Sequence, residues 1–137
     1  MKLHEIWLYK AENDLKSARK LIDGEIKILD TAIYHTQQCA EKGLKAYLSY
    51  KNEEIKKTHD IEVLINLCSK IDSDFRTLLE YGIELTPYST EYRYPDIELT
   101  PELIDVENAI IMAEKIIEFV KTKLIWNGRI FLNGKKL

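Results

Sequence analysis

The chain has 137 residues, a net charge of -3 at pH 7, and 45% hydrophobic and 31% charged residues, an ordinary balance for one soluble globular domain. Two cysteines exclude a disulfide scaffold, three widely separated histidines form no metal-binding motif, and no apolar run approaches the roughly 20 residues that span a bilayer. We therefore expect a cytoplasmic protein with no metal and no membrane segment, and the negative charge disfavours a broad nucleic-acid surface.

A first helix is predicted over about residues 3–22, because apolar residues recur there at spacings of three and four and Gly24 follows as a stop signal. Asp14 falls inside the apolar stripe, between Ala11 and Ala18, so it should face the core. A buried carboxylate without a partner is costly. We therefore expect another side chain to meet Asp14.

A second helix is predicted over about residues 30–52, and Gln37 lies on its apolar face. One side of this helix is a seam of small residues at steps of four and three: Ala32, Thr36, Cys39, Gly43 and Ala46. Glycine inside a helix costs about 1 kcal/mol relative to alanine, so Gly43 indicates that another helix approaches closely. The sequence leaves open whether that helix belongs to the same chain or to a second subunit.

The opposite face of the second helix is polar. It holds His35, Gln38, Lys42, Lys45 and Ser49, which project within one arc. Such a pattern is typical of the wet side of an amphipathic helix. The alternative is a strip that binds phosphate or a protein partner.

Three more helices follow in the sequence. A third is predicted over about residues 60–70 and a fourth from about 72 to 82, where Gly82 would end it. The fifth should open with Thr100 as its cap and Pro101 at its first position. Its apolar repeat is sustained for six turns, to about residue 124.

The chain ends in a basic tail. Residues 121–137 contain five lysines and arginines and no acidic residue, so this end either contacts phosphate or is a solvated terminus. Asn127 and Gly128, between two short apolar runs, are a hairpin signal, and disorder is the alternative. We therefore divide the chain into a helical bundle over residues 1–124 and a tail over residues 125–137.

The loop between the fourth and fifth helices is rich in tyrosine. Tyr88, Tyr92 and Tyr94 lie around Arg93. Tyrosine rings can stack on a base and arginine can bind a phosphate. Alternatively, the rings pack the loop onto the bundle and Arg93 pairs with a nearby acid. The chain has no glycine-rich phosphate-binding loop that would decide between the two.

Four segments, in this order, resemble the HEPN (higher eukaryotes and prokaryotes nucleotide-binding) family: residues 11–18 (AENDLKSA), 34–46 (YHTQQCAEKGLKA), 57–61 (KTHDI) and 92–95 (YRYP). Each segment is weak alone, and the four together are fairly specific. The similarity extends from about Trp7 to Val120.

The resemblance implies an all-α fold, an up-and-down bundle of four long helices plus a short fifth. It also implies a homodimer, and it suggests a minimal nucleotidyltransferase as protein partner in a toxin–antitoxin type of pair. ATP or another nucleotide is the implied ligand, and no cofactor is expected. A further branch of the family cleaves RNA with an arginine and a histidine that are four to six residues apart.

This sequence departs from the RNA-cleaving pattern. No histidine follows Arg19, Arg76, Arg93 or Arg129 at the required distance. We therefore expect a non-catalytic, nucleotide-binding or interaction domain. A metal-independent endoribonuclease with a rearranged site is the alternative, and a dimeric helical domain that binds no nucleotide is a third.

Two groups of residues carry these expectations. The first is a buried polar cluster that would fix the helix register, formed by Asp14, Gln37 and His59. The second is the surface that would bind a nucleotide or a partner, formed by His35, Gln38, Lys42, Lys45, Arg93 and Tyr94.

Overall fold

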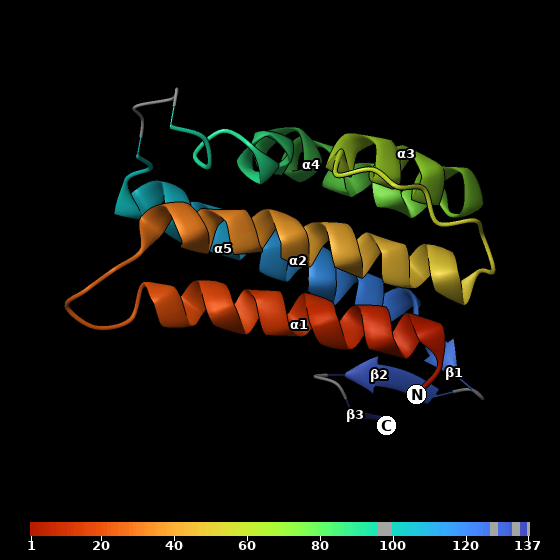
Figure 1. The fold of residues 1–137 in the computed structure, drawn as a ribbon. Helices are drawn as coiled ribbons and strands as arrows, with labels where there is room; N and C mark the ends of the chain where they lie inside the picture. Colours follow the sequence, from red (N-terminus) through yellow and green to blue (C-terminus); the bar gives the residue numbers. More distant parts are fainter. Residues whose placement is uncertain (96–99, 127–128, 133–134, 137) are drawn as a thin grey trace.

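A computed structural model of the chain describes residues 1–95, 100–126, 129–132 and 135–136, with side chains described up to Leu124. The predicted all-α fold is confirmed (Figure 1). The five helices are α1 (Leu3–Leu21), α2 (Leu29–Tyr50), α3 (Ile61–Ile71), α4 (Leu79–Leu85) and α5 (Leu103–Lys123). Three of them are long, and α3 and α4 are shorter. None of the helices in the described ranges is long and apolar enough to cross a membrane.

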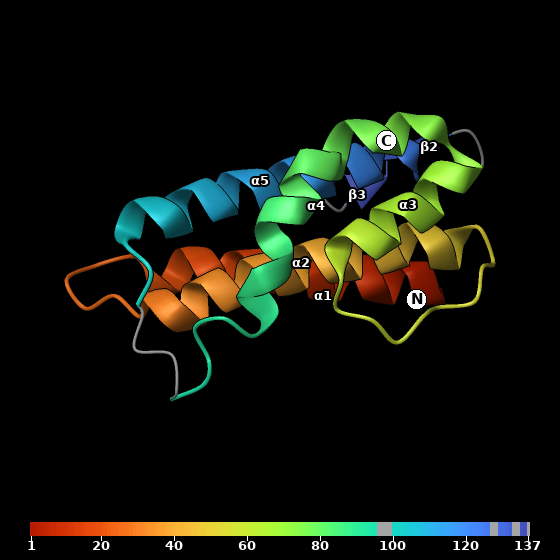
Figure 2. The same ribbon diagram turned by 90° about the horizontal axis from the view of Figure 1, so that it is seen from above.

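The second helix is the centre of the bundle. It runs between α1, α5 and the layer formed by α3 and α4 (Figures 1 and 2). Fourteen of its 22 residues are buried, so neighbours cover it on more than one side. This position decides the environment of every functional residue that α2 carries.

The small-residue seam of α2 packs within the chain. A Cβ atom added to Gly43 would lie 2.6 Å from Cδ1 of Ile117 on α5. The seam residues Ala32, Thr36, Cys39 and Ala46 are fully buried as well. The close approach expected at Gly43 is therefore made by α5 of the same chain.

The segment after α3 differs from the single helix predicted for residues 72–82. A 3₁₀ turn over Ser73–Leu78, capped by the Asp72 carboxylate, comes first, and α4 then continues past Gly82 to Leu85. Gly82 therefore lies inside the helix and does not end it. The absence of a side chain there allows α3 to pack closely. A Cβ atom there would lie 2.5 Å from Cδ1 of Ile65 on α3.

Two other boundaries also differ in detail. A second 3₁₀ turn over Thr86–Ser89 occupies the start of the predicted loop. Helix α5 is capped by Glu102, in a capping box with Asp105, and not by Thr100. The strong apolar repeat predicted the interior of α5 correctly, while the hydrogen bonds of the capping box determine its first residue.

Three short strands follow α5. Strand β1 (Ile125–Trp126) pairs antiparallel with β2 (Arg129–Leu132), which pairs antiparallel with β3 (Lys135–Lys136). They occupy the place where the sequence offered a hairpin or disorder as alternatives. Residues 127–128, where a turn is predicted, lie outside the described residues. Strand β2 lies against α5.

The packing at Gly43 gives a first prediction. Gly43→Leu should lower the free energy of unfolding by about 1–3 kcal/mol or more, because α5 leaves no room for the side chain. Urea unfolding would measure the loss. As a control, Asn66→Leu places the same side chain at an exposed position of α3 and should change the stability by no more than about 0.5 kcal/mol. Equal stability of the two variants would contradict the close approach.

Candidate functional site

Asp14 has the partners that its place in the apolar stripe required. Its side chain is only 10% exposed, and both carboxylate oxygens are used: Oδ1 lies 2.7 Å from Nδ1 of His35, and Oδ2 accepts a hydrogen bond of 2.7 Å from Nζ of Lys42. His35 and Lys42 are seven residues apart, so two turns of α2 present them on one face, toward α1. Lys42 balances the charge of Asp14 where water is scarce.

A second polar cluster lies around Glu41, also on α2. The Glu41 side chain is 5% exposed; its Oε1 lies 2.7 Å from Nδ1 of His59, and its Oε2 accepts a hydrogen bond of 2.9 Å from Nζ of Lys45. Gln37 donates from Nε2 to the main-chain carbonyl of His59 at 2.7 Å. These bonds hold the connector between α2 and α3 against α2.

The pKa of the Glu41 carboxyl is below its ordinary value. Burial alone would raise this pKa, because it disfavours the charged form. The hydrogen bonds from His59 and Lys45, together with the positive charge of Lys45, outweigh burial and lower it. Glu41 therefore contributes to stability as a carboxylate.

The predicted grouping of Asp14, Gln37 and His59 needs correction. Among the described residues, no hydrogen bond joins Asp14 to either of the other two, and the two clusters are built around different carboxylates. The His59 side chain is 71% exposed, and only its Nδ1 turns toward Glu41. Periodicity placed Asp14 and Gln37 on core-facing sides, but it could not show which neighbour each one meets.

The polar strip expected on the wet side of α2 is also partly enclosed. Gln38 and Lys45 are buried, with Nζ of Lys45 lying 5.6 Å from the ring centroid of Trp7 on α1. His35 and Lys42 keep about a quarter of their side chains exposed. The expectation of a solvent-exposed strip fails for Gln38 and Lys45 because neighbouring helices cover α2 on several sides. Part of its polar face is therefore buried.

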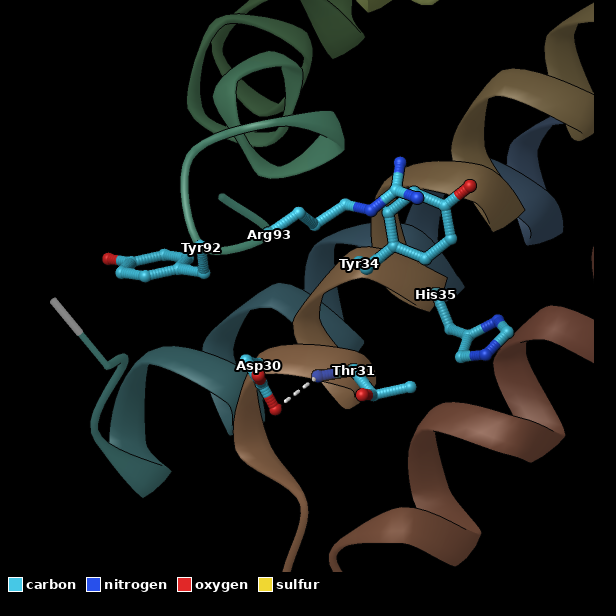
Figure 3. A pocket seen from close by; sticks show the side chains of 6 residues that line it. All are labelled: Asp30, Thr31, Tyr34, His35, Tyr92 and Arg93. Carbon is cyan, nitrogen blue, oxygen red and sulfur yellow. Dashed lines mark hydrogen bonds between the residues drawn. The ribbon is translucent and has the colours of Figure 1, made fainter. Parts of the chain in front are cut away.

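An open depression lies beside the first turns of α2. Its volume is about 330 Å³, and we call it the α2 depression; it is lined by Asp30, Thr31, Tyr34, His35, Tyr92 and Arg93. Figure 3 shows Asp30 and Thr31 on one side and Tyr92 and Arg93 on the other, with His35 turned toward α1. Two segments about sixty residues apart in the sequence therefore meet here.

Arg93 is held in place at this depression. Its guanidinium carbon lies 4.2 Å from the ring centroid of Tyr34, and Nη1 donates to the main-chain carbonyl of Ser89 at 3.3 Å. A cation stacked on an aromatic face gains about 0.5–2 kcal/mol. Arg93 is exposed, so part of its guanidinium stays available to a ligand.

The tyrosines of the loop divide into two roles. The rings of Tyr88 and Tyr92 lie 6.0 Å apart between centroids and pack against the core, and burial raises the pKa of Tyr88 to about 12. Tyr94 is 53% exposed and does not line the depression. The Tyr88 and Tyr92 rings therefore anchor the loop on the bundle, as one interpretation expected. Tyr92 and Arg93 also line the depression, and ligand binding by them stays a prediction.

Sequence reasoning missed several lining residues. Asp30, Thr31 and Tyr34 were not singled out, and neither was Glu41. Tyr34 begins the second family-like segment, and Glu41 lies one turn before Lys45. The place of Tyr34 in that segment and the spacing of Glu41 from Lys45 were the sequence features that could have identified these two residues. Asp30 and Thr31 had no signal other than their place at a helix start.

Comparison with known proteins gives one family. The model of the HEPN domain matches residues 4–123. The crystal structure of TT1696 from Thermus thermophilus is similar, with 27% identity and a TM-score of 0.74, covering 90% of this chain and 100% of that one. The crystal structure of ST0689, an archaeal HEPN homologue, has 30% identity and a TM-score of 0.68, covering 90% and 98%. No curated protein matches.

The lowered pKa of Glu41 gives a second prediction. At pH 7, Glu41→Gln should lower the free energy of unfolding by about 1–3 kcal/mol, because charged partners lose their carboxylate. A depressed carboxyl pKa stabilises the fold above the ordinary pKa of about 4.3 and loses that contribution as the pH falls through the lower, folded-state value. The gap between wild type and variant should therefore shrink toward pH 3, as measured by urea unfolding.

The control for this series is Glu62→Gln, which changes an exposed carboxylate on α3. That variant should stay within about 0.5 kcal/mol of wild type at pH 7. A gap for Glu41→Gln that keeps the same size from pH 7 to pH 3 would contradict the role of the Glu41 carboxylate.

Proposed function

Because this chain belongs to the HEPN domain family, we propose that it is a non-catalytic domain that binds a nucleotide in the α2 depression. The observation that carries the proposal is the meeting of Arg93, Tyr92 and Tyr34 at this one place. An arginine can bind a phosphate, and an aromatic ring can stack on a base. The volume lies at the lower end of the range of small-molecule sites.

The arrangement of charges supports binding more than turnover. His35, the only histidine of the depression, is bonded through Nδ1 to Asp14, and its ring turns toward α1 (Figure 3). Arg93 is stacked on Tyr34. A general acid or base must reach the reacting atom within hydrogen-bond distance. Here Nδ1 of His35 is engaged by Asp14 and the Arg93 guanidinium by the Tyr34 ring.

The proposal includes partners. We propose a homodimer, and a minimal nucleotidyltransferase as the protein that works with this domain. The proposal of a nucleotidyltransferase partner rests on the sequence resemblance. The homodimer is supported by Ile104 and Ile111, which are both more than half exposed and lie two turns apart on α5. A second copy of the chain that covered this face would remove both side chains from water.

A metal-independent endoribonuclease remains the second candidate. The observation in its favour is that His35 and Arg93 line the same depression although 58 positions separate them, a pairing that replaces the missing sequence spacing. A carboxylate that holds one ring nitrogen of a histidine is also a common way to prepare the other nitrogen for proton transfer. This candidate requires RNA cleavage that persists in EDTA.

The third prediction separates these functions. ATP and GTP, titrated separately into the purified protein by calorimetry, should give saturable binding that Arg93→Ala weakens about tenfold, the effect of losing one charge-assisted hydrogen bond. Arg76→Ala, at an exposed position away from the depression, is the matched control and should bind as wild type does.

Two outcomes would overturn the proposal. No heat from either nucleotide would exclude nucleotide binding and favour a surface for protein partners. Cleavage of RNA by the same preparation in EDTA, lost in His35→Ala, would establish the endoribonuclease instead.

A further inference from the structure

Among the residues that the structure describes, Asp30 of the α2 depression has no partner of opposite charge. Asp30 lies in the first turn of α2 and is exposed, and its Oδ1 accepts a hydrogen bond of 2.9 Å from the main-chain N–H of Thr31. Within the described part of the chain, no lysine, arginine or histidine forms an ion pair with it. Its second oxygen is therefore available to a ligand in the depression.

An acid in the first turn of a helix needs no ligand to explain it, because the helix dipole favours negative charge there. The independent observation is the surface opposite Asp30. Tyr92 and Arg93 line the other side of the same depression, and their side chains extend in opposite directions there, that of Arg93 over Tyr34 (Figure 3). The depression thus combines an acceptor-only group, an aromatic ring and a cation, which are the three groups that a nucleotide can use.

The chemistry of the bases decides which nucleotide suits this set. A carboxylate accepts hydrogen bonds and donates none. Guanine presents two adjacent donors, N1–H and the N2 amino group, on its Watson–Crick edge. Adenine and cytosine each place an acceptor nitrogen beside their amino donor, and uracil has one donor between two carbonyls. Only guanine offers a carboxylate two adjacent donors, and its O6 acceptor lies at the far end of the edge, outside that pair.

From this complementarity we propose that the α2 depression selects guanine nucleotides, with Asp30 as the residue that determines the base. Asp30 accepts from the Watson–Crick edge, the Tyr92 ring packs against the base, and Arg93 binds phosphate. This inference rests on the proposed nucleotide binding and adds the substrate class to it.

The test is a calorimetric comparison of GTP, ITP, ATP, CTP and UTP on the wild-type chain. GTP should bind at least tenfold more tightly than ATP, because an acceptor facing a carboxylate loses one hydrogen bond and adds repulsion. ITP keeps N1–H and lacks the N2 amino group, so its affinity should fall between those of GTP and ATP.

Two variants assign the selectivity to a residue. Asp30→Asn keeps the shape of the side chain and replaces one acceptor by a donor, so it should weaken GTP about tenfold and leave ATP unchanged or slightly tighter. Asp23→Asn is the matched control, because it removes an exposed carboxylate from outside the depression, and it should bind GTP as wild type does.

The possible outcomes distinguish guanine selectivity from the nucleotide binding on which it rests. Equal affinities for GTP and ATP would overturn the guanine selectivity and leave nucleotide binding in place. A GTP preference that persists in Asp30→Asn, or that falls equally in Asp23→Asn, would overturn the role of Asp30. No binding of any of the five would overturn both proposals.

Discussion

The enclosure of α2 is the constraint on which the rest of the structure depends. This helix carries charged side chains into the centre of the bundle, and an unpaired charge buried there would cost several kcal/mol. Asp14 of α1 meets two of these side chains, His35 and Lys42, while Glu41 is met by its helix neighbour Lys45 and by His59 of the following connector. The pairs therefore determine how α1 and the connector are placed against α2.

This internal pairing also limits where a ligand can bind. Lys45 is buried and Lys42 is bonded to Asp14, so these cations serve the fold first. Side chains at the beginning of α2 and on the turn that carries Arg93 stay open to a small molecule in the α2 depression. Stacking on Tyr34 joins the two. The proposed function therefore depends on which side chains are not used in internal pairs, as well as on which residues belong to the family-like segments.

Much of the fold could be predicted from periodicity, and less of the site. The stripes of α1 and α5 predicted their helices, and the core-facing Asp14 and the helical Gly43 each indicated a contact that the structure contains. Their partners could not be predicted, because a period of 3.6 residues defines a face of one helix and not the neighbour opposite it. Glu41 could not be recognised for the same reason, because it is buried by neighbours that the periodicity of α2 does not identify. The depression joins segments far apart in the sequence, which no local pattern reports.

The most direct test of this account is a pair of double-mutant cycles measured by urea unfolding at pH 7. If Asp14 anchors α1 through its own pair, the cycle of Asp14→Ala with Lys42→Met should show a coupling energy of about 0.5–3 kcal/mol. The cycle of Asp14→Ala with His59→Ala, which joins the two separate clusters, should show a coupling no larger than about 0.5 kcal/mol. Strong coupling between Asp14 and His59, or none between Asp14 and Lys42, would contradict the account of two independent carboxylate clusters.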